Sequence, residues 1–206
     1  MRLTRTEDAT VEPVTLEDVK EELILTGTAD DGLINRFIKS GRQYVENFCK
    51  ISIFTLTWEV TFSQQELCPP GNPPLTDMTA DRITLPRSPI QSINSVTWTN
   101  EDATPAGATM ITLIPPGTST TLTETTDYRL EGDVLIFVSP KNYDAIGTYT
   151  VNYDAGFDDS DANLVPEDLL SAIRVMVSSN YENREQKTIP SGLRQLLAPY
   201  RRGRLL

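Results

Sequence analysis

The sequence predicts an α+β protein in which a small helical core carries an inserted antiparallel β lobe of about six strands. Apolar residues recur at helical spacing near both ends of the chain, and between these regions the period changes to about two. Two N-terminal helices, one long C-terminal helix and a short one cannot each bury an apolar stripe alone, so we expect them to pack together. The predicted division is a helical core of residues 1–50 and 160–198, a β lobe of residues 51–159 and a basic C-terminal tail of residues 199–206.

The first helix is expected to begin at Thr15, because Thr15 and Asp18 have the spacing of a capping box, and to stop at Gly27. A second helix is expected from Asp30–Asp31 onward, with Gly41 at a point of close packing. Its apolar residues lie on one side of a 3.6-residue wheel. They are Leu33, Ile34, Phe37, Ile38, Tyr44, Val45, Phe48 and Cys49.

Alternating apolar and polar residues then predict strands, with a break at Pro86 and a hairpin turn at Glu131–Asp133 around Gly132. The strand segments are residues 51–62, 81–90, 91–99, 109–114, 127–138 and 147–157. The proline-rich stretch 69–74 must be a loop, because proline supports neither a ladder nor a helix. The threonine-rich connection 115–126 is expected to be exposed, and no role is assigned to either segment.

The long C-terminal helix is expected to have Pro166 at its first position, with Glu167 and Asp168 favouring the positive end of the helix dipole. Its apolar stripe comprises Leu169, Leu170, Ile173, Met176, Val177 and Tyr181. One or two further helical turns are expected in residues 193–199, where Pro199 ends them.

The composition is that of a globular protein, since 38% of the 206 residues are hydrophobic and 23% are charged. The net charge of −11 opposes broad binding to nucleic acids or anionic membranes. Cys49 and Cys68 are expected to be reduced thiols, with a disulfide between them as the alternative. The N-terminus lacks the apolar region of a secretory signal and no stretch is long and apolar enough to span a membrane, so we expect a soluble cytoplasmic product.

The sequence offers no clear catalytic machinery. Histidine is absent, and there is no phosphate-binding loop, nucleophile turn or CxxC spacing, so we expect neither an enzyme nor a cofactor. Four aspartates, Asp154, Asp158, Asp159 and Asp161, could share a hard cation, but a solvated loop is the favoured interpretation and no metal site is predicted. A glycan or peptide platform could be lined by Trp58, Trp98, Tyr128, Tyr149 and Tyr153, although packing inside the protein is the favoured interpretation.

The C-terminal tail contrasts with the acidic chain, because from Gln186 onward there are five cationic residues and no acidic one. A cluster of one charge beside a tyrosine and two leucines is typical of a peptide that docks on an acidic or grooved surface. The alternative is a frayed terminus whose arginines keep it soluble. The predicted docking residues are Tyr200, Arg201, Arg202, Arg204, Leu205 and Leu206.

The collinear series of "VTLEDVKEELIL", "DDGLINRFIKSGRQYVENFC", "ITLPRSPIQSINSVTW", "YTVNYDAGF", "VPEDLLSAIRVMVSSNYENRE" and "LLAPYRRGR" resembles the head-tail connector, or adaptor, proteins of tailed bacteriophages and gene transfer agents. The resemblance implies a structural virion protein that forms a ring, usually of twelve subunits, beneath the portal. Such a ring joins the DNA-filled head to a stopper or other neck or tail protein, and DNA passes through it only as transient cargo. The protein would be made in the host cytoplasm and act in the virion neck.

In this family the C-terminal segments reach into the portal, so the resemblance implies that the tail arginines pair with portal carboxylates or carbonyls. Surplus carboxylates on the ring's inner face would keep DNA sliding, and Glu17, Asp18, Glu21, Glu22, Glu182 and Glu185 are candidates. The alternatives are a neck stopper or tail-terminator ring protein, a carbohydrate-binding β module and a small metal-dependent enzyme.

Overall fold

The computed structural model describes residues 1–6, 9–63, 82–101, 119–138, 147–157, 165–183 and 189–202. The chain folds into two compact units, which we call the β unit, residues 1–7 and 56–155, and the helical unit, residues 8–55 and 156–206. The predicted α+β class is confirmed, with helices in one unit and two antiparallel sheets in the other. The N-terminal residues, which the sequence-based division grouped with the helices, pair into a sheet of the β unit.

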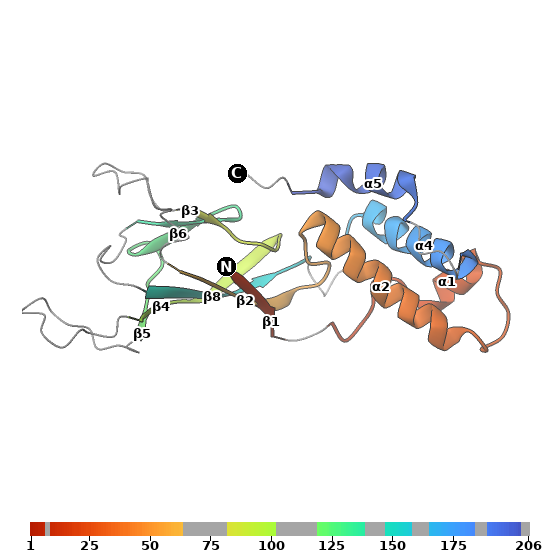
Figure 1. The fold of residues 1–206 in the computed structure, drawn as a ribbon, viewed down its shortest axis with the longest axis horizontal. Coiled ribbons are helices and arrows are strands. Elements are labelled where there is room, and N and C mark those ends of the chain that lie inside the picture. Colours follow the sequence, from red (N-terminus) through yellow and green to blue (C-terminus); the bar gives the residue numbers. More distant parts are fainter. Residues whose placement is uncertain are drawn as a thin grey trace, which may run out of the picture. The chain divides into compact units, whose positions relative to one another are not determined.

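The helical unit is built on α2, which packs along α4 (Figure 1). The helix α1 contacts both of these, and α5 contacts α4 and α2. The bounds are α1 Leu16–Glu22, α2 Asp31–Cys49, α4 Glu167–Glu182 and α5 Ser191–Leu197, followed by a short 3-10 helix Ala198–Tyr200. The sequence predicted Pro166 at the first helical position of α4, but Pro166 is the N-cap and the helix begins at Glu167.

The predicted capping box at the start of α1 is confirmed. The backbone N–H of Asp18 donates to Thr15 Oγ1 at 3.1 Å, and the N–H of Thr15 donates to Asp18 Oδ2 at 3.3 Å. These two bonds satisfy donors that have no partner inside the helix. The side-chain hydrogen bond with Thr15 lowers the pKa of Asp18, because it favours the ionised carboxylate.

Replacing Thr15 with alanine is expected to lower the free energy of unfolding by about 1 kcal/mol at neutral pH, since the cap is lost. Because the pKa of Asp18 is lowered in the folded state, its contribution is present above the ordinary aspartate value of 3.8 and is lost as the pH falls through the folded pKa. Urea unfolding of both proteins across this range should show the difference shrinking in acid. A constant difference would contradict this account, and Thr10→Ala, at an exposed position, is the control.

The first helix ends at Glu22, and the prediction that it continues to Gly27 is wrong. The chain leaves the helix through Ile24, whose φ of 54° is left-handed. That conformation crowds a β-branched side chain against its own backbone. Ile24 is also 88% exposed, so neither packing nor backbone preference explains an isoleucine there.

We expect Ile24→Gly to raise the free energy of unfolding by about 0.5–1 kcal/mol, because glycine adopts this φ without the clash and its greater chain entropy offsets only part of the gain. Thermal unfolding followed by the helical circular dichroism signal measures this change. Destabilisation by Ile24→Gly would show that the isoleucine contributes packing which its exposure does not reveal.

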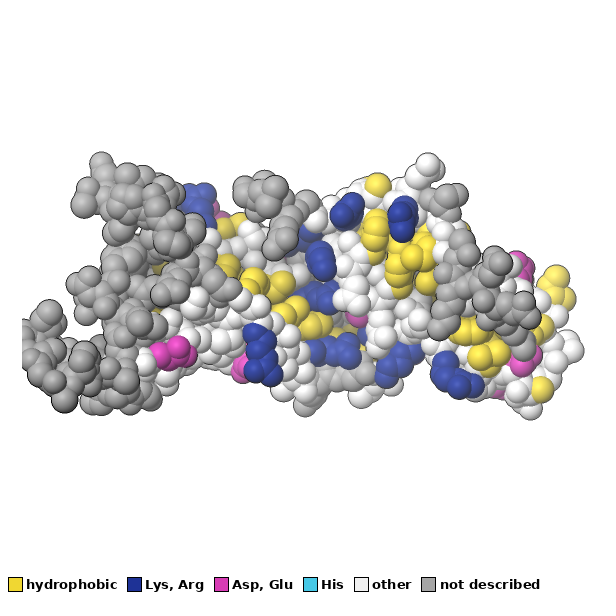
Figure 2. Space-filling view, in the orientation of Figure 1, with side chains coloured by type: hydrophobic (Ala, Val, Ile, Leu, Met, Phe, Trp, Pro, Cys, Tyr) yellow, Lys and Arg dark blue, Asp and Glu magenta, His cyan; other side chains and the backbone are white. Residues whose placement is uncertain are grey.

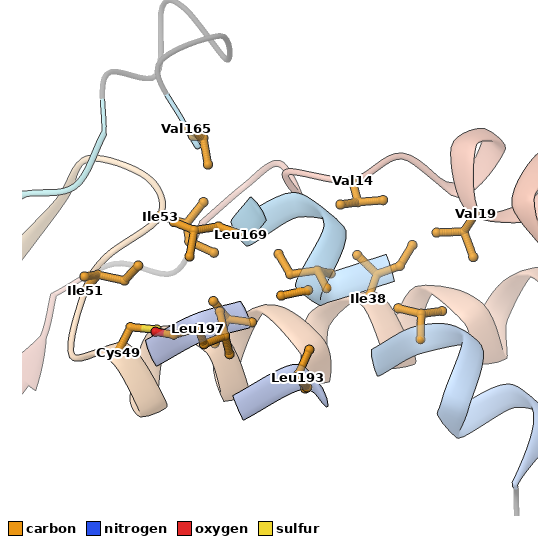
Figure 3. Packing of buried hydrophobic residues seen from close by; sticks show 14 of the residues in the cluster. Val14, Val19, Ile38, Cys49, Ile51, Ile53, Val165, Leu169, Leu193 and Leu197 are labelled. Atoms are coloured by element: carbon orange, nitrogen blue, oxygen red, sulfur yellow. The ribbon is translucent and has the colours of Figure 1, made fainter. Parts of the chain in front are cut away.

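The apolar stripes of these helices meet in one core (Figure 3). The predicted close packing at Gly41 is confirmed, since a Cβ placed there would lie 3.3 Å from Ile173 Cγ2 on α4. Ile51 and Ile53, predicted to begin a strand, instead lie before β2 and are buried in this helical core. Figure 3 shows Ile51 and Leu197 together with Cys49 at one end of the core.

The β unit contains a five-stranded sheet of order β1-β2-β8-β4-β5 and a three-stranded sheet of order β3-β7-β6, with neighbouring strands antiparallel. The bounds are β1 Arg2–Arg5, β2 Leu56–Ser63, β3 Arg82–Thr84, β4 Ile90–Asn100, β5 Ser119–Thr121, β6 Tyr128–Glu131, β7 Val134–Phe137 and β8 Gly147–Ala155. Gly132, with φ of 62°, occupies the predicted turn between β6 and β7.

Two strands were not predicted from the sequence. β1 pairs with β2 at the N-terminus, and β5 forms inside the connection 115–126 that had been expected to be exposed. The predicted strand 109–114 lies outside the described residues.

The two tryptophans belong to the core of the β unit, with Trp58 5% and Trp98 1% exposed. The guanidinium of Arg87 lies 4.9 Å from the Trp58 ring centroid, an arrangement typical of a cation–π contact. The aromatic rings of Phe62 and Tyr149 stack beside them at 5.5 Å. The favoured interpretation, packing inside the protein, is therefore confirmed for both tryptophans, and an exposed platform on them is excluded.

Candidate partner-binding surface

The structure describes three of the six residues predicted to dock on a partner, namely Tyr200, Arg201 and Arg202. Arg204, Leu205 and Leu206 lie outside the described residues. The three described residues contact the chain's own helical unit. The first part of the tail is therefore positioned by contacts within the subunit, which the sequence did not indicate.

Each of these residues contacts a different part of the helical unit. Tyr200 donates its hydroxyl to Asp168 Oδ2 at 2.9 Å, and this bond raises the pKa of Tyr200 because the neutral phenol is the donor. The guanidinium of Arg201 lies 5.3 Å from the Phe48 ring centroid. The backbone N–H of Arg202 donates to the carbonyl of Cys49 at 3.2 Å, and desolvation lowers the pKa of its side chain.

The tail is held there because α5 is anchored in the helical core by Leu193 and Leu197. The carbonyl of Leu197 lies 3.9 Å from Cys49 Sγ at the end of α2. Burial of this thiol raises the pKa of Cys49 to about 11. The end of α2 and the start of the tail thus share one packed site.

We expect the Cys49 thiol to react slowly with a water-soluble disulfide reagent at mildly alkaline pH, because it is buried and its pKa is raised to about 11. Leu197→Ala should speed labelling by loosening α5, measured in a Cys68→Ser background so that only one thiol reacts. Leu196→Ala, at a less buried position of α5, is the control. Equal labelling rates for all three proteins would contradict the anchoring role of Leu197.

Exposed cations occur on α2, at its C-terminal end, on α5 and at the start of the tail. Figure 2 shows dark blue side chains along the face over α2 and α5, with yellow side chains between them. We call the exposed cations of α2, α5 and their C-terminal ends the basic face; they are Arg36 and Lys39 on α2, Lys50 at its C-cap, Arg194 on α5 and Arg201 after it. Between Gly32 and Lys50 the one acidic residue is Glu46, which is buried and paired with Arg42 at 3.2 Å.

The helix α1 has the opposite charge. We call its exposed carboxylates, Glu17, Asp18, Glu21 and Glu22, the acidic face. Its one cation, Lys20, is half-buried and its Nζ lies 2.8 Å from Asp31 Oδ1. These four carboxylates and the exposed Glu182 are among the candidates for a channel wall, whereas Glu185 lies outside the described residues.

Asp154, the described member of the predicted aspartate cluster, accepts hydrogen bonds from Thr57 Oγ1 at 2.7 Å and Asn94 Nδ2 at 2.9 Å. Its three partners at 158, 159 and 161 lie outside the described residues, as do Cys68 and the loop 69–74. Among the residues that the structure describes, no group of three acidic, cysteine or histidine side chains could hold a metal ion. Within the same ranges no helix is long and apolar enough to cross a membrane.

Comparison with known proteins finds one matching family and several solved structures of similar fold. Residues 13–110 match the model of a family described as Phage gp6-like head-tail connector protein. No curated protein matches the chain by sequence. Three solved structures are similar over 100% of this chain and 98% of theirs at 18% identity. They are the neck of an empty GTA particle computed with C6 symmetry (TM-score 0.68), the virion of a native gene transfer agent particle (0.68) and the neck of a native GTA particle computed with C12 symmetry (0.65).

The resemblance to head-tail connector proteins predicted from the sequence is therefore confirmed. The matched family and the matched particles are those of structural connector and neck proteins, which agrees with the prediction that this chain is structural and not an enzyme.

Proposed function

We propose that this relative of the Phage gp6-like head-tail connector proteins forms a ring in the neck of a phage or gene transfer agent particle, where it joins the DNA-filled capsid to the tail. The observation that carries the proposal is the extent of the structural likeness, which covers the whole chain and nearly all of the matched neck protein. Both units therefore have counterparts in a protein of a particle neck. The C12 symmetry of one matched neck supports a ring of twelve copies.

The helical unit favours a connector over the alternative of a stopper or tail-terminator ring, which would be more purely β. The family match begins at residue 13 and includes both α1 and α2. A stopper or another neck protein is instead the proposed partner on the tail side.

We propose that the C-terminal tail fastens the ring to the portal. The contacts of Tyr200 and Arg201 with the helical unit fix where the tail leaves its own subunit. Arg204, Leu205 and Leu206 follow within four residues of Arg202, so a fixed starting point limits the volume they can reach and the entropy lost on docking. Arginine suits this role because its guanidinium binds carboxylates through two hydrogen bonds.

The test is a pull-down of the cognate portal with a chain that lacks residues 203–206. This deletion leaves the contacts of Tyr200, Arg201 and Arg202 in place, so the helical unit should stay folded while portal binding is lost. A chain with Arg204→Gln, Leu205→Ser and Leu206→Ser separates the side chains from chain length. Unchanged portal binding by both variants would remove the tail from the mechanism.

DNA would pass through the ring as transient cargo. With a net charge of −11 the subunit has more carboxylates than cations, and a surface with this balance repels phosphates rather than holding them. We expect no retention of duplex DNA by the purified protein at physiological salt. Synthesis in the host cytoplasm followed by assembly on the particle completes the proposal.

A further inference from the structure

The acidic face on α1 and the basic face on α2 and α5 belong to the same helical unit and have opposite charge. The acidic face has four exposed carboxylates within a seven-residue helix, and its single lysine is turned toward Asp31 and the carbonyl of Gly27. The cations of the basic face are Arg36 and Lys39, which are three positions apart and therefore neighbours on the surface of α2, Lys50 at its C-cap, Arg194 on α5 and Arg201 at the start of the tail. Each subunit therefore carries two complementary surfaces.

An apolar feature accompanies each face. Ile24 follows α1 directly and projects its side chain into solvent, 88% exposed, from a left-handed backbone that opposes isoleucine. Next to Arg201 of the basic face, whose guanidinium lies 5.3 Å from the Phe48 ring centroid, Tyr44 and Phe48 are half-buried and stack with ring centroids 5.9 Å apart. A single exposed isoleucine beside charged residues, and an aromatic pair beside cations, have the composition of the centre and rim of an interface.

We propose that the acidic face and Ile24 of one copy of this chain dock on the basic face of the next copy. The inference rests on the proposed ring and names the surfaces that build it. A closed ring needs two different surfaces on each subunit, and opposite charges on them fix which surface meets which. Ile24 lies against the Tyr44 and Phe48 rings in this contact, which removes its apolar side chain from water.

A second copy fits this basic face better than a polyanion does. The remainder of the chain is strongly acidic, so a nucleic acid, whose phosphates are negative along its whole length, is repelled at longer range. In a second copy of the chain the negative charge that meets the basic face is the local cluster of carboxylates on α1. The proposal assigns the α1 carboxylates to a contact between subunits rather than to the channel wall.

The decisive experiment is carbodiimide cross-linking of a concentrated equal mixture of unlabelled and ¹⁵N-labelled protein at low salt. Carbodiimide joins carboxylates to lysines in contact, and mixed isotopes in one peptide pair identify links between copies. We expect links from Glu17, Glu21 or Glu22 of one copy to Lys39 or Lys50 of another. The variant with Lys39→Arg and Lys50→Arg keeps the charge but cannot couple, and should lose these links.

Charge reversal supplies the matched test of the same contact. Arg36→Glu with Arg194→Glu leaves every coupling residue in place and should lower the yield of α1–α2 links between copies by about tenfold. Replacing the same two arginines with lysine keeps the charge and should leave the links from α1 to Lys39 and Lys50 unchanged. Exchanging the exposed β-unit pair Arg129 and Glu131 should leave the yield unchanged.

Ile24→Gly should lower the same yield while raising the melting temperature, which separates loss of a contact from loss of folding. Links between copies that join other surfaces, or no links between copies at all, would overturn this inference. Neither result would overturn the connector function, which the portal pull-down tests separately. Portal binding with no α1–α2 link would show that the ring uses other contacts.

Discussion

Replacing Arg42 with alanine is expected to lower the free energy of unfolding of the helical unit by about 3–5 kcal/mol. The Arg42 side chain is 0% exposed, and its guanidinium joins two carboxylates. Its Nε and one terminal nitrogen donate to Glu12 at 2.7 and 3.2 Å, and the other terminal nitrogen donates to Glu46 at 3.2 Å. Without Arg42, Glu46 would remain buried as a carboxylate whose counter-charge had been removed, and this desolvation accounts for most of the cost.

The consequence extends beyond one ion pair, because Glu46 Oε1 also accepts the backbone N–H of Ile53 at 3.2 Å. Arg42 and Glu46 thereby connect the segment before α1, the helix α2 and the segment that follows α2.

Urea unfolding followed by helical circular dichroism measures the effect of Arg42→Ala, since both tryptophans lie in the β unit and their fluorescence reports on that unit instead. Arg36→Ala, on the exposed side of the same helix, should change stability by less than about 0.5 kcal/mol. If Arg42→Ala lowered the free energy of unfolding by less than about 1 kcal/mol, water would be solvating Glu46 in place of the guanidinium.

The second large effect is expected for Gly156→Ala, which should destabilise the helical unit by about 3 kcal/mol or more. Gly156 has a φ of 143°, and a Cβ there would come within 1.9 Å of the carbonyl oxygen of Phe54 and 2.5 Å of the Thr55 nitrogen. These are backbone atoms, so no side-chain rotation can relieve the clash. Two hydrogen bonds join the segments 53–55 and 156–157 at this point. Phe157 N–H donates to the carbonyl of Ile53 at 3.3 Å, and Thr55 Oγ1 donates to the carbonyl of Phe157 at 2.6 Å.

The matched control is Gly32→Ala in the first turn of α2, where no atom lies within 4 Å of an added Cβ. Alanine favours helix over glycine, so this variant should be more stable by about 0.5–1 kcal/mol. The two glycine-to-alanine changes should thus shift the urea midpoint in opposite directions. A small shift of the same sign in both would mean that the chain around Gly156 can move apart at little cost.

The elements that could be predicted from the sequence are those whose stabilising partners lie close in the sequence. The helices α2 and α4 were predicted from the spacing of their apolar residues, and the start of α1 from the spacing of Thr15 and Asp18. The hairpin was predicted from Gly132, which lies between two segments of alternating apolar and polar residues. In each, a local pattern and the tertiary contacts favour the same structure.

The features that could not be predicted depend on partners far away in the sequence. β1 is four residues long and forms because β2 offers it an edge, more than fifty residues later. Ile51 and Ile53 alternate as in a strand, yet the helical core buries them. Arg42 lies beside the apolar stripe of α2, but nothing in the sequence pairs it with Glu12, thirty residues earlier.

The candidate site was predicted in part. The cationic residues of the tail could be recognised by charge alone, but the contacts of Tyr200 with Asp168 and of Arg201 with Phe48 follow from how α5 packs. The acidic residues of α1 were noted as exposed candidates, and their relation to the cations of α2 emerges only when both helices are seen in one folded unit. The exposure of Ile24 could not be foreseen, because its spacing after Leu23 suits a continuing helix.

The chain passes between the two units three times, and this has a consequence for the order of events on the ribosome. The last strand of the β unit, β8, leaves the ribosome before α4, so the sheets can close while α2 still lacks the helix that covers Gly41. Since domains tend to fold as their segments emerge, the helical unit can close only after α4 and α5 have left the ribosome. Until then the side of α2 that carries Gly41 would remain uncovered in the nascent chain.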